Sequence, residues 1–334
     1  MPSLKARIAP ALHRLAWALG LSTFRARAQP VMRILMLHGI GADDYPEETF
    51  TAQAEWLARR FSVVPLDVIA RKAAEGKSTP SREIALTFDD GLKGHATVVY
   101  PILKRLGLPA TFFLCPGLIA SGRWLWTHEM RARLETLGRD CIDALVREVV
   151  CGPVALASVT VGRHMAGAHA TTAVVGSEAM ISRMKELPSE TRAAAEERVR
   201  EATPEFTPGG SEGERYDVMT WDDAAGLDPA LITIGSHTST HPILPTLDGA
   251  QQEEEIAGSR RLLEERLGRT VDLFCYPNGS RDAKVEASVR RHYRAAVTTH
   301  PGFVRPGDDL HTFARIAAPA SSPLLAWRLH RPGA

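Results

Sequence analysis

Short apolar runs alternate with helical patterns along most of this chain, and that alternation is the feature that most limits its fold. From Arg33 onward the runs are rich in β-branched or aromatic residues, and the segments between them have amphipathic helical spacing. Such alternation is typical of βα units around a mostly parallel sheet. The expected strands are Ile34–Leu37, Ile84–Phe88, Ala110–Leu114, Leu231–Gly235, Leu273–Tyr276, Ala295–Thr299 and Phe313–Ala317. Seven strands with helices between them predict an α/β barrel.

Three connecting segments carry helix signals. Pro46-Glu47-Glu48 opens a helix that runs to Arg60, because proline and acidic residues fit a first helical turn. His95–Leu106 has helical spacing. Gln251–Leu267 is a charged amphipathic helix that ends before Gly268.

Residues from about 120 to 217 interrupt this rhythm. They combine helical stretches such as Glu190–Glu201 with a loop over 207–213 that is rich in glycine. We therefore expect a basic N-terminal segment over residues 1–30 and one domain over 31–334. The domain carries a helical insertion at about 120–217.

Charge and cysteine content narrow the classes of partner and site. Lysine plus arginine number 40 and aspartate plus glutamate 39, so the net charge of +1 provides no field that would attract nucleic acid. The cysteines form no C-x-x-C pair and are expected to be reduced core thiols. They are Cys115, Cys141, Cys151 and Cys275.

The first 28 residues are basic and contain no acidic residue. Their apolar run is interrupted by His13 and Arg14, so it is too short for the roughly 20 residues of a membrane span. A helix packed on the domain or exposed to solvent, a helix on a membrane surface and an atypical export signal all fit this pattern. We expect a cytoplasmic protein, for which peripheral membrane contact through residues 1–28 stays one of these alternatives.

Two adjacent acids stand where the second expected strand ends, in Thr87-Phe88-Asp89-Asp90-Gly91. Neighbouring carboxylates repel each other unless a cation or a proton is shared between them. A turn at Gly91 can direct both toward one cavity, where one could bind a metal ion while the other acts as a base. The alternative is a solvated turn with two acids.

Two histidines follow the fourth expected strand, in His237-Thr238-Ser239-Thr240-His241-Pro242. Histidines four residues apart meet on one face of a helical turn and can bind one ion. Alone, the pair could be incidental surface histidines. Together with one carboxylate it makes an open site of the zinc-hydrolase type.

A third motif, Phe274-Cys275-Tyr276-Pro277-Asn278-Gly279, ends another strand. Pro277 shapes the turn, and the backbone amide of Tyr276 is predicted to be free to bind an oxyanion. An ordinary strand-to-loop turn is the alternative.

These motifs resemble those of the polysaccharide deacetylases, carbohydrate esterase family four. The resemblance extends to Ile34–His38, Leu108–Phe113 and Met219–Asp223 and covers roughly residues 33 to 320, apart from much of the insertion. It implies a distorted (β/α)7-type barrel, in which Asp89 is the catalytic base and Asp90, His237 and His241 bind the metal ion.

Two departures from the family pattern concern the arginine and the acid. Cys275 occupies the place of the arginine that pairs with the catalytic aspartate, and we expect Arg315 to replace it. The acid-bearing Leu-x-Ile-x-His strand is absent near the C-terminus, but Leu35-Met36-Leu37-His38 matches it, as in permuted family members. His38 is therefore the expected general acid, with His300 and His311 as competitors.

The resemblance implies a metal-dependent enzyme that removes N-acetyl groups from N-acetylhexosamine-containing glycans or glycoconjugates. Zinc is the expected ion, and cobalt, nickel and manganese are compatible with the same ligands. Two other functions fit parts of the pattern. One is hydrolysis of a cyclic ureide or imide, and the other is carbohydrate binding by a decayed site.

Overall fold

The computed structural model describes residues 4–41, 45–76, 82–137, 141–142, 144–145, 177–209 and 211–333. They form two compact units. The first comprises residues 1–123 and 217–334, and the second comprises residues 124–216.

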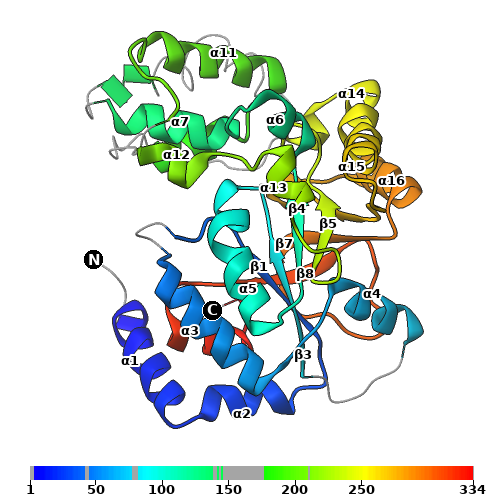
Figure 1. Cartoon of the computed structure of the whole chain (residues 1–334). Helices are drawn as coiled ribbons and strands as arrows, with labels where there is room; N and C mark the ends of the chain where they lie inside the picture. The colour runs from blue at the N-terminus through cyan, green and yellow to red at the C-terminus, as the bar shows by residue number, and fades with distance from the viewer. Residues whose placement is uncertain are drawn as a thin grey trace. The chain divides into compact units, whose positions relative to one another are not determined.

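The first unit contains a closed barrel of parallel strands (Figure 1). The sheet order is β1-β8-β7-β6-β5-β4-β3-β2, and a pairing of β1 with β3 closes it. All strands except β2, which pairs with the start of β3, form the seven-stranded barrel. The strands are β1 (Arg33–Leu37), β2 (Ser62–Val63), β3 (Glu83–Phe88), β4 (Ala110–Leu114), β5 (Ile232–Ser236), β6 (Leu273–Cys275), β7 (Ala295–Pro301) and β8 (Phe313–Ala317). The predicted barrel and its seven strands are confirmed.

Helices surround the barrel in this unit. They are α1 (Leu4–Ala18), α2 (Leu21–Ala28), α3 (Glu47–Arg60), α4 (Leu66–Glu75), α5 (Tyr100–Leu106), α6 (Pro116–Ser121), α13 (Trp221–Ala225), α14 (Gly249–Glu253), α15 (Ser259–Leu267), α16 (Ala283–His292) and α17 (Ser322–Arg328). Short turns are the π-helical η1 (His95–Val99) and η3 (Glu254–Gly258) and the 3₁₀ turns η2 (Leu244–Thr246) and η4 (Pro277–Gly279).

The three predicted helices are present, but two are longer or less regular than expected. α3 begins after Pro46 and ends at Arg60 as predicted. The helix predicted over His95–Leu106 starts with the π-helical turn η1 and continues as α5. The helix predicted over Gln251–Leu267 begins earlier, because Asp248 caps it in a capping box, and it contains η3 in the middle.

Side chains on the strands alternate between two apolar layers. Ile34, Phe113 and Cys275 belong to the cluster inside the barrel, whereas Phe112 and Phe274 pack in the layer beneath the helices. This alternation follows from the two-residue period of a strand. It directs Cys275 toward the barrel interior.

The second unit is helical in its described part and consists of α7 (Trp126–Glu135), α10 (Ser177–Met184), α11 (Ser189–Glu201) and α12 (Ser211–Tyr216). Methionines from α7 and α10 form its apolar core together with Val199. Glu129 accepts hydrogen bonds from Arg133 and Arg200, which joins α7 to α11.

The cysteines and the described helices bear on two further expectations. Cys115 and Cys275 are buried free thiols, and Cys151 lies outside the described residues. Cys141 is exposed, so the expectation of a core thiol is wrong there, where the sequence is charged. The described helices are all too short or too polar to cross a bilayer.

Candidate metal centre

The two adjacent aspartates follow the last residue of β3, Phe88, at the carboxyl end of the barrel. Asp90 has a φ of 79° and Gly91 a φ of 66°, so the chain turns sharply through left-handed conformations. Asp89 and Asp90 are both buried. The turn therefore directs both carboxylates into the interior, as the sequence predicts.

The two histidines lie in a loop that follows β5. Among the described residues, four non-glycine residues have positive φ, and Thr238 and His241 are two of them. The helical turn predicted for this segment is therefore wrong, because Thr238 leaves the right-handed helical region. The loop nevertheless brings the rings of His237 and His241 to 4.7 Å between centroids.

Three donor atoms converge between these two strand ends. The Nε2 atoms of His237 and His241 lie 3.5 and 3.6 Å from Oδ1 of Asp90, respectively. The three side chains are buried, and their donor atoms all lie within 4.8 Å of one another. Such spacing suits two imidazoles and one carboxylate around a single divalent ion.

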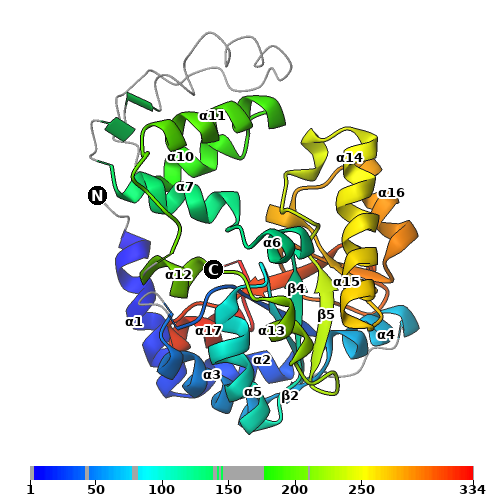
Figure 2. The same ribbon diagram turned by 45° about the horizontal axis from the view of Figure 1, so that its top comes forward.

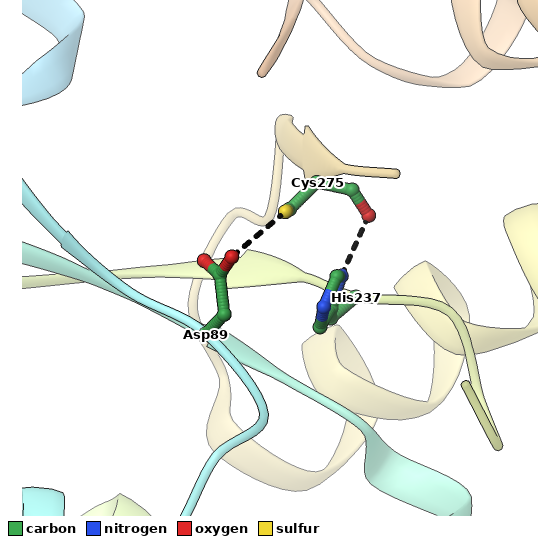
Figure 3. A group of neighbouring side chains, drawn as sticks. All are labelled: Asp89, His237 and Cys275. Carbon is green, nitrogen blue, oxygen red and sulfur yellow. Dashed lines mark hydrogen bonds between the residues drawn. The ribbon is translucent and has the colours of Figure 1, made fainter. Parts of the chain in front are cut away.

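The tautomer of His237 is fixed by the strand beside it. Its Nδ1 lies 2.8 Å from the backbone carbonyl of Cys275 (Figure 3), so Nδ1 carries the proton. The lone pair of Nε2 is then left on the side of Asp90, whose Oδ1 is 3.5 Å away. Burial lowers the pKa of His237, but Cys275 and the Asp90 carboxylate outweigh it and raise the pKa well above its ordinary value. Proton and metal ion therefore compete for this imidazole.

A second group of possible ligands, Asp89, His237 and Cys275, overlaps the first. It is the weaker candidate for two reasons. Both Asp89 oxygens accept hydrogen bonds from Arg315, and burial raises the pKa of the Cys275 thiol, which disfavours the thiolate that would bind a metal ion.

Asp89 forms a buried, bidentate ion pair with Arg315 of β8. The two guanidinium nitrogens lie 2.7 and 2.6 Å from the two carboxylate oxygens. Burial raises the pKa of Asp89, but Arg315 outweighs it and lowers the pKa to about 2. Arg315 thus pairs with Asp89, as the sequence predicts for a replacement arginine.

Cys275 lies in this network, in the place of the family's arginine. Its Sγ is 3.5 Å from Oδ2 of Asp89, and Figure 3 shows the thiol and the carbonyl of Cys275 directed at Asp89 and His237. Arg315 also donates to this Sγ at 3.2 Å. A small thiol here leaves room for an arginine that arrives from another strand.

His38 follows β1 at the same end of the barrel. Its Nε2 lies 3.8 Å from Oδ2 of Asp89, and half of its side chain is exposed. One competitor for the role of acid, His300, is exposed near the carboxyl end of β7. His311 contacts the carbonyl of Tyr293, just before β7 begins, so it lies at the opposite end of the barrel.

The prediction of a free Tyr276 amide is wrong. This amide donates to the carbonyl of Val297 at 3.2 Å, which continues the pairing of β6 with β7. The phenol ring packs against Phe274, in the layer outside the barrel. Tyr276 therefore offers no oxyanion donor in this structure.

Two further residues support the centre and were not predicted. Glu255 accepts hydrogen bonds from the amides of Ser239 and Thr240, at 2.8 and 2.9 Å, and so holds the histidine loop. His95 is fully buried, and its Nε2 lies 3.1 Å from the carbonyl of His38. Both residues lie in π-helical turns, which sequence periodicity does not predict.

Comparisons with known proteins concern the family and the fold of this chain. Residues 76–296 match the family described as polysaccharide deacetylase. YxkH of Bacillus subtilis (strain 168) is 27% identical over 112 residues, a match that spans 33% of this chain and 40% of that protein. The Streptococcus pyogenes deacetylase PplD, solved in complex with acetate, has 18% identity and a TM-score of 0.57, with 91% of this chain and 100% of that chain covered. IcaB from Ammonifex degensii has 16% identity and a TM-score of 0.56, with 90% and 98% covered. The likeness to these structures concerns the fold.

Proposed function

Because the chain belongs to the polysaccharide deacetylase family, we propose that it is a metal-dependent hydrolase of N-acetylhexosamine-containing glycans or glycoconjugates. The proposed role is in surface polysaccharide or glycolipid metabolism. The observation that carries the proposal is the convergence of Asp90, His237 and His241 beside the ion-paired Asp89. Four side chains from two distant parts of the sequence meet at one end of the barrel.

Asp90, His237 and His241 would hold the metal ion. Two imidazoles and a carboxylate suit zinc, and cobalt, nickel and manganese accept the same ligands. A bound divalent ion would polarise an amide carbonyl and make a water molecule easier to deprotonate.

Asp89 would act as the base. With a pKa of about 2 its carboxylate is ionised at neutral pH, so its oxygens can accept a proton from a water molecule that the bound metal ion would acidify. Arg315 holds both oxygens and fixes their direction. The hydroxide adds to the acetamide carbon, and the C–N bond then breaks to release acetate.

His38 would protonate the departing amine. It is half exposed, so its ring can reach a substrate, and its Nε2 lies 3.8 Å from the base. The Nε2 atom of His95 hydrogen-bonds to the backbone carbonyl of His38. Burial lowers the pKa of His95 to about 4, so its ring is neutral and donates its Nε2 proton to that carbonyl.

The ion pair also argues against a decayed site. Loss of the family's arginine at Cys275 would leave Asp89 as an unpaired buried charge, which is strongly unfavourable. Arg315 supplies the missing cation from β8.

Acetate release from N-acetylglucosamine oligomers tests the proposal, with zinc, cobalt, nickel and manganese supplied in turn. Wild-type protein should release acetate with at least one metal. His237→Ala should abolish this activity, and His38→Gln should lower it by about 10²–10⁴. Near wild-type release by His237→Ala would refute the metal centre. Hydrolysis of cyclic imides without any release of acetate would favour the alternative function, an enzyme that hydrolyses cyclic ureides or imides.

A further inference from the structure

The helices α1 and α2 carry the exposed apolar surface of the first unit. Among the described residues, the large hydrophobic side chains that are exposed all lie between positions 12 and 24. Leu19 is 63% exposed and Phe24 is 72% exposed. The complete set, named the N-terminal patch below, is Leu12, Leu15, Leu19, Leu21 and Phe24. Concentration of such side chains in one place marks an interaction surface.

The patch faces away from the barrel because other side chains of the same helices pack inward. The rings of His13 and Trp17 of α1 pack, tilted, against Trp327 and Trp56, with ring centroids 4.8 and 4.7 Å apart, respectively. Leu12 and Leu15 lie on a different side of α1, and Leu19 continues the same spacing of three and four residues just after the end of this helix. Figure 2 shows α1 and α2 beside α17 and α3. The helices are therefore anchored while their leucines remain uncovered.

A cavity of about 700 Å³ lies next to the patch, between α2 and α3. Its aromatic lining residues are Trp17, Phe24 and Trp56, and its charged lining residues are all arginines: Arg27, Arg60 and Arg82. The Nε atom of Arg27 is buried and has no hydrogen-bond partner among the described residues. Arginines beside an apolar surface suit an anionic phosphate group.

We propose that the N-terminal patch docks on an anionic lipid bilayer, with a lipid phosphate bound by the three arginines of the adjacent cavity. Leucine and phenylalanine side chains enter the interface between headgroups and acyl chains, and the basic residues attract the anionic headgroups. The sequence up to Ala42 contains no acidic residue that would oppose this. Charge complementarity is the reason to choose a membrane over an apolar protein surface.

The docking surface is separate from the metal centre. Arg82 precedes β3, and α2 leads into the start of β1, so the cavity lies at the amino ends of the strands. Asp89 and His237 follow the carboxyl ends of β3 and β5. Changes in the patch should therefore leave acetate release from a soluble oligosaccharide unchanged.

Co-sedimentation of the full chain with vesicles tests the proposal. Vesicles of phosphatidylcholine with phosphatidylglycerol should bind the protein, and vesicles of phosphatidylcholine alone should bind it at least about tenfold more weakly. Leu15→Gln/Leu19→Gln should weaken binding by about tenfold or more, because two side chains lose their apolar contact. Arg27→Gln/Arg60→Gln/Arg82→Gln should also weaken it and reduce its salt dependence.

A matched triple variant separates the cavity from general charge. Arg105→Gln/Arg261→Gln/Arg291→Gln removes three exposed arginines elsewhere and should retain most of the binding. Equal loss in both triple variants would overturn the lipid site. No binding to anionic vesicles would overturn the docking surface, as would a dimer in solution that Leu15→Gln/Leu19→Gln dissociates. Circular dichroism and acetate release from a soluble oligosaccharide confirm that each variant is folded.

Discussion

Arg315 of β8 donates two hydrogen bonds, of 2.7 and 2.6 Å, to the carboxylate of Asp89, which follows β3. Both side chains are almost completely buried. The pair joins strands that are far apart in the sequence, with β1 between them in the barrel. Arg315 also donates to the Thr298 carbonyl and to Thr87. The guanidinium is thus held from several sides, and it holds the carboxylate proposed as base.

Replacement of Arg315 by methionine should destabilise the protein by about 3–5 kcal/mol, because Asp89 would remain as an unpaired buried charge. Urea unfolding at neutral pH measures this loss. Asp89→Asn/Arg315→Met should recover part of it, since neither charge then remains. A change below about 1 kcal/mol in the single variant would contradict a strong pair.

The same ion pair predicts how stability depends on acid. The folded pKa of Asp89, about 2, lies below its ordinary value of 3.8. Its contribution to stability is therefore complete above the ordinary value and is lost as the pH falls through the folded value. Wild-type protein should lose stability relative to Asp89→Asn/Arg315→Met as the pH is lowered from about 4 toward 2. Parallel stability curves for the two proteins would contradict this assignment.

The strands and the strand-end motifs could be predicted from sequence because local patterns specify them. Apolar runs located all seven barrel strands, and Asp89, Asp90, His237 and His241 each follow such a run. By contrast, β2 comprises only Ser62 and Val63, which is too short to form a pattern.

Other features depend on contacts that local sequence does not contain. The pairing of β6 with β7 binds the Tyr276 amide, and no property of residues 274–279 reveals that partner. The left-handed conformations of Thr238 and His241 depend on a loop that Glu255 holds from η3. Arg315 is expected to pair with Asp89 because it lies on the last predicted strand, whereas its two contacts with Asp89 depend on the fold.

If the proposed roles of the two aspartates are right, replacing Asp90 and replacing Asp89 should have different effects on zinc binding and on acetate release. Asp90→Asn should weaken zinc binding strongly, because a ligand loses its charge. Asp89→Asn should keep near wild-type zinc affinity but lower acetate release by about 10²–10⁴, because the base is lost. Chelator competition and initial rates measure the two quantities. Equal effects of the two variants on zinc affinity would contradict the division of roles.

Glu255 should act on the metal centre through the loop that it holds. Glu255→Gln should weaken zinc binding by about 10–100-fold, the usual effect of losing a group that orients metal ligands. Glu254→Gln is the matched control, since Glu254 is exposed and pairs with Arg261 outside the loop. Equal zinc affinity in the two variants would show that the loop holds its shape without Glu255.

Zinc affinity should rise with pH, because His237 must lose its proton before Nε2 can bind the ion. Although burial lowers the pKa of His237, neighbouring groups that include the Asp90 and Asp89 carboxylates raise it above its ordinary value, so a proton competes with the ion for this ring. Over the pH range in which each bound ion releases one proton, the apparent Kd for zinc should fall by about tenfold per pH unit. His38→Gln should keep this slope, since His38 lies outside the ligand set. A Kd that does not change between about pH 6 and pH 8 would show that His237 binds no metal ion or is already neutral there.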